Sequence, residues 1–177
     1  MRLPSLLVIV FVAMAIEARR AARNERAQLA RGGVEPPGDV YDVMRVVYPL
    51  AFLGMLVESA LGGGPPRAVA LAGASVFAAA KALKWWAIAS LGPFWTFRVI
   101  VIPGAALVSR GPYRWLRHPN YVAVMGELAG VALLTGAMWS GVTALVVFGL
   151  LLIKRMAVEE RALDAARSPS STSKEGD

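Results

Sequence analysis

The sequence contains no cysteine and a single histidine, His118. Disulfide bonds, thiolate ligands and cysteine nucleophiles are therefore excluded, and a metal site built on histidine or cysteine is not expected. Charged residues are also scarce, at 18% of 177 residues, whereas 56% are hydrophobic and the mean hydropathy is +0.54. Because a soluble domain of this length needs more polar surface, the composition predicts an integral membrane protein.

The few charges are mostly basic. The net charge is +7 and the sequence pI is near 10.4. In a soluble protein this excess would suggest a nucleic-acid partner. In a membrane protein it is typical of lysines and arginines gathered on the side of the bilayer that retains them. We therefore expect membrane lipids, and no nucleic acid, among the partners.

Apolar runs predict an all-α membrane protein with about five transmembrane helices. A bilayer core about 30 Å thick needs ~20 helical residues, which the three middle runs reach and the first and last reach only with their flanks. A charged segment, 17–26, directly follows the first run, so we expect a retained helix and no cleaved signal peptide. The expected spans are 3–18, 44–61, 67–91, 119–138 and 140–156, the last two as a tight hairpin, in one domain, 1–167, with a disordered tail, 168–177.

The distribution of basic residues predicts the topology. With the N-terminus outside, 17 of the 19 lysines and arginines fall toward one side: six around the first long connection, six from the later part of the third run to the fourth, and five after the fifth. Only Arg2 and Arg67 fall on the other side. The positive-inside rule then places both long connections, the C-terminus and any active site in the cytoplasm. We expect the protein to lie in a bacterial inner membrane.

The segment 109–121 is the most unusual in the chain. Its sequence is Ser-Arg-Gly-Pro-Tyr-Arg-Trp-Leu-Arg-His-Pro-Asn-Tyr, in which Gly111-Pro112 is a turn signal and Pro119 suits the first turn of a helix. The start of that helix, with Arg117 and His118, favours an anion. The aromatic side chains nearby add flat faces for a ring. An interfacial belt that anchors a helix end explains the same residues equally well.

Three further charged residues, Arg155, Glu159 and Glu127, are candidates for a role in the site. Arg155 and Glu159 are four residues apart and share a helix face, which for an isolated pair usually means a weak helix-end salt bridge. Glu127 lies ~12 Å into the fourth span, where an unpaired charge costs at least ~2.5 kcal/mol. Glu127 must therefore face the polar pocket near His118, as a substrate-binding group, or pair with Lys81 or Lys84. The sequence leaves both alternatives open.

One stretch between the third and fourth runs is not expected to be helical. Residues 95–104, Trp-Thr-Phe-Arg-Val-Ile-Val-Ile-Pro-Gly, are rich in β-branched side chains and end in Pro-Gly. Such an extended segment must lie outside the hydrocarbon or line a cavity. The chain has no P-loop, no glycine-rich nucleotide fingerprint and no cluster of metal-ligand residues, so we expect no metal.

These motifs together resemble a known family. The block 111–121 with its Arg-His-Pro-Asn-Tyr, followed after a helical hairpin by Arg155-Met-Ala-Val-Glu-Glu160, is similar to the isoprenylcysteine carboxyl methyltransferase family. Residues 24–35, 84–88 and 91–104 resemble its bacterial branch, and the resemblance covers roughly residues 15–165. Relatives often carry glutamine near the position of Arg98.

The resemblance implies an S-adenosylmethionine-dependent O-methyltransferase. It implies that Arg155 and Glu159 are catalytic and face the methyl acceptor, a lipophilic small molecule or prenylated acceptor methylated on a carboxyl or hydroxyl oxygen. In the bacterial branch this includes lipid-like phenols, pyrones and carboxylates. The implied cofactor-binding residues are Ala105, Ala106, Leu107, Val108, Tyr113, Arg117, His118, Pro119, Asn120, Tyr121 and Glu160.

Two other functions fit parts of the same pattern. Strings similar to Arg-His-Pro-Asn-Tyr also occur in membrane sterol and steroid reductases that use a reduced nicotinamide cofactor. A membrane scaffold whose basic face binds anionic lipid would explain the charge distribution without any chemistry. Binding of S-adenosylhomocysteine without binding of the reduced nicotinamide would exclude the reductase. Loss of function in His118→Ala and Glu159→Ala would exclude the scaffold.

Overall fold

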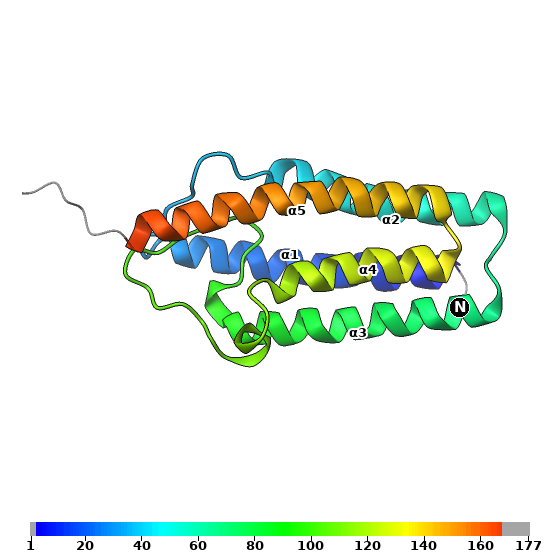
Figure 1. Cartoon of the computed structure of the whole chain (residues 1–177), viewed down its shortest axis with the longest axis horizontal. Coiled ribbons are helices and arrows are strands. Elements are labelled where there is room, and N and C mark those ends of the chain that lie inside the picture. The colour runs from blue at the N-terminus through cyan, green and yellow to red at the C-terminus, as the bar shows by residue number, and fades with distance from the viewer. Residues whose placement is uncertain (1–2, 168–177) are drawn as a thin grey trace, which may run out of the picture.

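The computed structural model describes residues 3–167 and consists of five α-helices with two short 3-10 turns. The helices run side by side along the long axis of the molecule, and each is antiparallel to the next along the chain (Figure 1). The prediction of an all-α membrane protein with five helices is confirmed. Their bounds are α1 Leu3–Leu29, α2 Tyr41–Gly62, α3 Arg67–Leu91, η1 Gly92–Phe94, η2 Gly111–Arg114, α4 Pro119–Thr135 and α5 Met138–Arg167.

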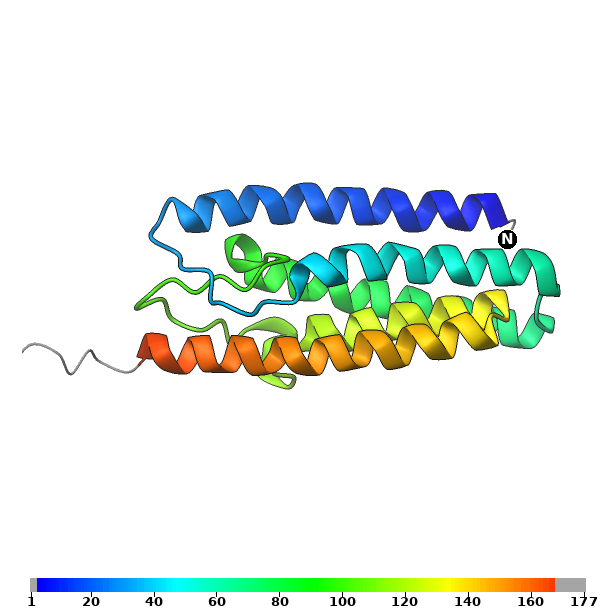
Figure 2. The same ribbon diagram turned by 90° about the horizontal axis from the view of Figure 1, so that it is seen from above.

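Three of the helical segments are long and apolar enough to cross a membrane: Tyr41–Gly62, Arg67–Phe94 and Met138–Ala165. Helix α1 and helix α4 are not among them, and α4, with 17 residues, is at the lower limit of the ~17–25 that a span needs. The crossing of the membrane by α1 and α4 therefore stays a prediction. Both helices nevertheless lie alongside the other three over most of their length (Figure 2).

Two helices extend well beyond the predicted spans. Helix α1 continues to Leu29, where the sequence predicted a span that ends at residue 18, and α5 continues to Arg167, where it predicted residue 156. In both cases the added turns are charged, so the apolar run shows where a span ends and not where the helix ends. Helix α4 ends three residues early, at Thr135, because Gly136 adopts a left-handed conformation with φ of 71°.

The most extensive contact in the bundle joins α3 and α4. Glycines permit this close approach: a Cβ atom on Gly73 would lie 2.3 Å from the backbone nitrogen of Leu134, and one on Gly130 would lie 2.6 Å from that of Phe77. Small residues that let backbones touch are typical of helix packing in membranes. The main core lies among α2, α4 and α5, where Phe52, Met55 and Leu128 are fully buried.

Both long connections, 30–40 and 92–118, lie at one end of the bundle together with the end of α5 (Figure 1). This arrangement agrees with the placement of the polar sequence on one side, although the side itself stays a prediction. As expected, residues 95–101 are not helical, and Val101 forms an isolated antiparallel bridge with Val34. The bridge ties the two connections together. The predicted tail, 168–177, lies outside the described residues.

Candidate functional site

The polar end of the bundle contains a cavity of about 890 Å³. The second long connection, 92–118, and all five helices contribute to its lining. Its walls change in character along the bundle: Tyr113, His118 and Glu159 line the end near the connections, whereas Phe11, Met14 and Phe148 line the end inside the helices. The cavity therefore offers polar groups at one end and, inside the helices, apolar side chains beside the charged Glu17 and Lys84.

Arg155 is the centre of the polar wall. Its guanidinium forms an ion pair with Asp39, with Nη1 3.1 Å from Oδ1, and the two side chains are only 7% and 5% exposed. Its Nε donates to the Tyr121 hydroxyl at 3.0 Å, and its Nη2 donates to the carbonyl oxygen of Phe97. Three other segments of the chain thus hold one guanidinium in a fixed place, which is the geometry needed to present a cation to an anionic ligand.

Tyr121 connects Arg155 to Glu159. The Tyr121 hydroxyl donates to Oε2 of Glu159 at 2.7 Å while it accepts from Arg155. The sequence placed Arg155 and Glu159 on one helix face with a direct salt bridge as the simple explanation. No direct bridge between them occurs in the structure; the ion-pair partner of Arg155 is Asp39 instead. Arg155, Tyr121 and Glu159 all line the cavity.

Sequence reasoning missed Asp39. Its Oδ1 also accepts from the backbone nitrogen of Tyr41 at 3.1 Å, and its Oδ2 accepts from that of Val99 at 2.9 Å. The local signal was an aspartate two residues before a helix, which is a usual turn and cap pattern. Nothing local could indicate a partner 116 positions away along the chain.

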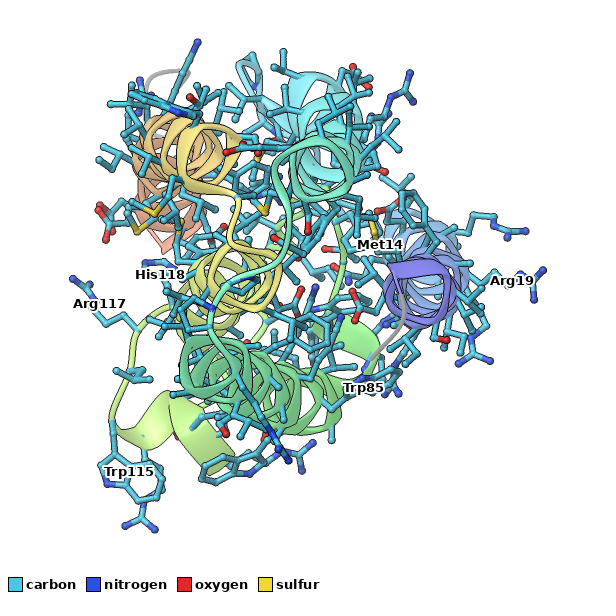
Figure 3. All side chains as sticks on the ribbon, turned by 90° about the vertical axis from the view of Figure 1, so that its right-hand side faces the viewer. Met14, Arg19, Trp85, Trp115, Arg117 and His118 are labelled. Carbon is cyan, nitrogen blue, oxygen red and sulfur yellow. The ribbon has the colours of Figure 1, made fainter. Side chains whose placement is uncertain are left out.

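The start of α4 agrees with the sequence prediction: Pro119 is its first residue and His118 is its N-cap. The imidazole of His118 stacks on the ring of Tyr121, with centroids 5.1 Å apart and planes 7° from parallel. Its Nδ1 lies 3.8 Å from Glu159 and its Nε2 lies 3.9 Å from Glu160. Arg117 points away from the bundle (Figure 3), is 87% exposed and lies 3.7 Å from Glu160.

Asn120 has a buried hydrogen-bond acceptor that no described residue satisfies. Its Oδ1 is buried, lies in a residue that lines the cavity, and has no hydrogen-bond partner among the described residues. A buried acceptor without a partner costs about 1–3 kcal/mol, so native proteins normally satisfy it with water or a ligand. A donor group of a bound molecule, such as an ammonium, would satisfy it.

The connection before α4 supplies the apolar side of this end. Leu107, Val108 and Tyr113 line the cavity, whereas Ala105, Ala106 and Pro119 are not part of its lining. Burial raises the pKa of the Tyr113 hydroxyl, and the charge of Glu159 raises it further, so this phenol stays neutral. Gly111 enables the turn: its φ is 61°, and a Cβ there would lie 2.0 Å from Oγ of Ser90.

A buried ionic cluster lies beneath the polar wall. Glu127, ~9 Å beyond Tyr121 along α4, lies 3.0 Å from Lys81 and 3.2 Å from Lys84, and accepts a hydrogen bond from Tyr48. Glu17 on α1, which the sequence did not suggest, lies 2.9 Å from Lys81 and 2.7 Å from Lys84. Of the two alternatives for Glu127, the structure favours pairing with the lysines. Its role in binding substrate stays a prediction.

Arg98 is held on the outer side of the cavity. It forms an ion pair with Glu35 at 2.6 Å and lies over the ring of Tyr41. The hydrogen-bonded ion pair with Glu35 raises the pKa of Arg98. Within residues 3–167, no group of three or more histidine or acidic side chains is arranged to hold a metal ion.

Comparison with known proteins decides the family. The model of the isoprenylcysteine carboxyl methyltransferase family matches residues 71–165, which include η2, α4 and most of α5. The chain belongs to this family. Its membership makes the protein a membrane methyltransferase, and enzymes of the family generally use S-adenosylmethionine.

Relatives extend the similarity to most of the chain. The chain is 32% identical over 158 residues to the uncharacterized protein YpbQ of Bacillus subtilis (strain 168), covering 89% of this chain and 94% of the relative. It is 22% identical over 159 residues to an uncharacterized protein of Haemophilus influenzae (strain ATCC 51907 / DSM 11121 / KW20 / Rd), covering 89% and 90%. No solved structure matches the chain.

Proposed function

We propose that this methyltransferase transfers the methyl group of S-adenosylmethionine to a carboxyl or acidic hydroxyl oxygen of a lipophilic or prenylated acceptor. The observation that carries the proposal is the fixed guanidinium of Arg155 on the wall of a cavity that extends between the helices to Phe11, Met14 and Phe148. A lipid-like acid needs both features, a cation for its oxygen and an apolar compartment for its tail.

The residues at the start of α4 suit the amino-acid end of the cofactor. The unpartnered Oδ1 of Asn120 can accept a hydrogen bond from an ammonium group. The helix start and His118 favour a carboxylate. Leu107, Val108 and Tyr113 provide apolar and aromatic surface for a purine ring. When bound, S-adenosylmethionine supplies an electrophilic methyl group; the chain itself supplies position and charge.

Arg155 and Glu159 have separable roles in this proposal. Arg155 holds the acceptor oxygen in its anionic form and orients it, and orientation alone can lower a barrier by several kcal/mol. An acceptor hydroxyl loses one proton when its oxygen is methylated. Glu159, which already accepts from Tyr121 and is 32% exposed on its side chain, offers that proton a carboxylate and a route to solvent.

The proposal extends to the membrane and to the topology of the chain in it. We propose that the membrane is a bacterial inner membrane, that the N-terminus lies outside, and that the cavity end with the long connections faces the cytoplasm. The cofactor then enters from the cytoplasm and the acceptor from the bilayer. The asymmetric basic residues support this orientation.

Binding experiments on the purified protein in detergent test the cofactor. We expect S-adenosylhomocysteine to bind in a calorimetric titration, and reduced nicotinamide dinucleotides to give no heat. His118→Ala should weaken the binding of S-adenosylhomocysteine, while Glu159→Ala should reduce methyl transfer. Binding of the nicotinamide alone would support the reductase. Full binding and transfer in both variants would support a scaffold in place of an enzyme.

A further inference from the structure

Helix α1 has two faces of different character. The face toward the bundle carries Val10, Met14, Glu17, Ala21 and Asn24, at helical spacing, and all but the half-buried Met14 are buried. In the view along the bundle, Met14 points toward the other helices and Arg19 points away from them (Figure 3). The orientation of α1 about its own axis is therefore settled by what its inner face contacts.

Those inner contacts are specific and mostly polar. Glu17 pairs with both Lys81 and Lys84. Asn24 donates to the carbonyl oxygen of Trp95 at 2.7 Å, and Gln28 donates to that of Pro93 at 3.0 Å. Rotation of α1 would break all of them, so the opposite face stays turned outward.

The outward face is a continuous stripe. It begins with Val8, Val12 and Ile16, which are 56%, 52% and 48% exposed, and continues with the exposed residues Arg19, Arg23 and Arg26. At 3.6 residues per turn, all six lie within about 80° of one another around the helix axis. The stripe is apolar in its first half and cationic in its second.

Neither acidic residue of α1 pairs with the arginines of the stripe. The acidic residues of α1 are Glu17, which pairs with the lysines, and Glu25, which accepts hydrogen bonds from the backbone nitrogens of Phe97 and Arg98. None of the three arginines forms an ion pair within residues 3–167. Like charges at i,i+4 repel each other on a helix, so an external anion between Arg19 and Arg23 would be stabilising.

We propose that this stripe binds an anionic phospholipid, with the phosphate at Arg19 and Arg23 and an acyl chain along Val8, Val12 and Ile16. The spacing supports this occupant. At 1.5 Å per residue, Arg19 lies ~4.5 Å beyond Ile16 along the axis, within a headgroup layer of ~5–7.5 Å, and Arg23 lies ~10.5 Å beyond it, from where its long side chain can reach back to a phosphate. Arg26, at ~15 Å, lies outside this layer and contributes less.

The bound lipid would lie against a helix that forms one wall of the cavity, because Phe11, Met14 and Glu17 of α1 all line the cavity.

The binding of the lipid does not depend on methyl transfer and is tested separately. Native mass spectrometry of the purified chain, with dioleoyl phosphatidylglycerol or dioleoyl phosphatidylcholine added to the detergent, measures both affinities with identical acyl chains. We expect phosphatidylglycerol to bind at least ~10-fold more tightly, since each arginine near a phosphate contributes about 5-fold.

Charge-matched variants locate the site. Arg19→Gln with Arg23→Gln should lower the affinity for phosphatidylglycerol about 10- to 30-fold and leave that for phosphatidylcholine unchanged. The control is Lys154→Gln with Arg161→Gln, at two exposed positions near the end of α5. It removes the same charge and should change the affinity for phosphatidylglycerol less than ~3-fold. Arg19→Lys with Arg23→Lys should retain most of the preference.

Two outcomes would overturn the proposal. If wild type shows no preference for phosphatidylglycerol, the stripe is a solvated face. If both glutamine pairs lose affinity equally, the whole basic end attracts the lipid and α1 has no site. Thermal unfolding checks that the variants fold, and we expect unchanged midpoints because the substituted side chains leave the inner contacts of α1 intact.

Discussion

Replacing Asp39 by asparagine should disable the site without unfolding the bundle. The Asp39 carboxylate pairs with Arg155 and accepts two backbone hydrogen bonds, at an exposure of 5%. Removing one partner of a buried ion pair costs about 3–5 kcal/mol. Asparagine keeps one oxygen, and Arg155 keeps Tyr121 and Phe97 as acceptors, so we take the lower limit. That cost, ~3 kcal/mol, falls on stability; because a displacement of a catalytic group by ~1 Å can cost about 100-fold in rate, we expect kcat/KM to fall by about 100-fold when Arg155 loses this partner.

The measurement is methyl transfer from labelled S-adenosylmethionine into a lipid extract, together with calorimetric binding of S-adenosylhomocysteine. Asp39 is not part of the cavity lining, so binding should change less than ~3-fold while transfer falls. Asp42→Asn is the matched control: that carboxylate lies three residues further on, in the first turn of α2, but is 71% exposed, and we expect less than a twofold effect. Wild-type transfer in Asp39→Asn, or an equal loss in Asp42→Asn, would refute the reasoning.

Three further predictions test other parts of the structure. Asn120→Ala should weaken the binding of S-adenosylhomocysteine by ~10-fold or more in calorimetry, because a hydrogen bond to an ammonium is worth about 1.5–3 kcal/mol; unchanged affinity would remove Asn120 from the cofactor site. Glu127→Leu should lower the free energy of unfolding by about 3–5 kcal/mol, because it leaves Lys81 and Lys84 to share Glu17; an unchanged thermal midpoint in detergent would argue against a structural pairing. Gly73→Ala should destabilise the protein by about 1–3 kcal/mol because its Cβ would meet the backbone of α4, and equal stability to wild type would contradict that packing.

The sequence predicted the helices well because apolar runs of bilayer length have few alternatives. It predicted the start of α4 at Pro119 because proline at the first turn and a turn signal before it are local rules. It failed at the ends of α1 and α5, whose last turns are polar and find their partners in the connections or in solvent. Helix ends of that kind depend on tertiary contacts that no local pattern records.

In the site, too, the sequence predicted what depends on local spacing and missed contacts between residues far apart in the chain. The shared face of Arg155 and Glu159 follows from helical spacing, and the structure adds Tyr121 as the residue between them. Asp39 and Glu17 were not predicted, because each gains its role from residues more than 60 positions away. The pairing of Glu127 was one of two alternatives that only the packing of α3 against α4 could distinguish.

The most direct test of the account is the transfer of a labelled methyl group from S-adenosylmethionine to an extractable lipophilic product by the purified chain. We predict that wild type forms a labelled product soluble in organic solvent, and that Arg155→Ala binds S-adenosylhomocysteine but forms at least ~100-fold less of that product. Identification of the product would then name the acceptor. A wild-type rate retained in Arg155→Ala would contradict the account.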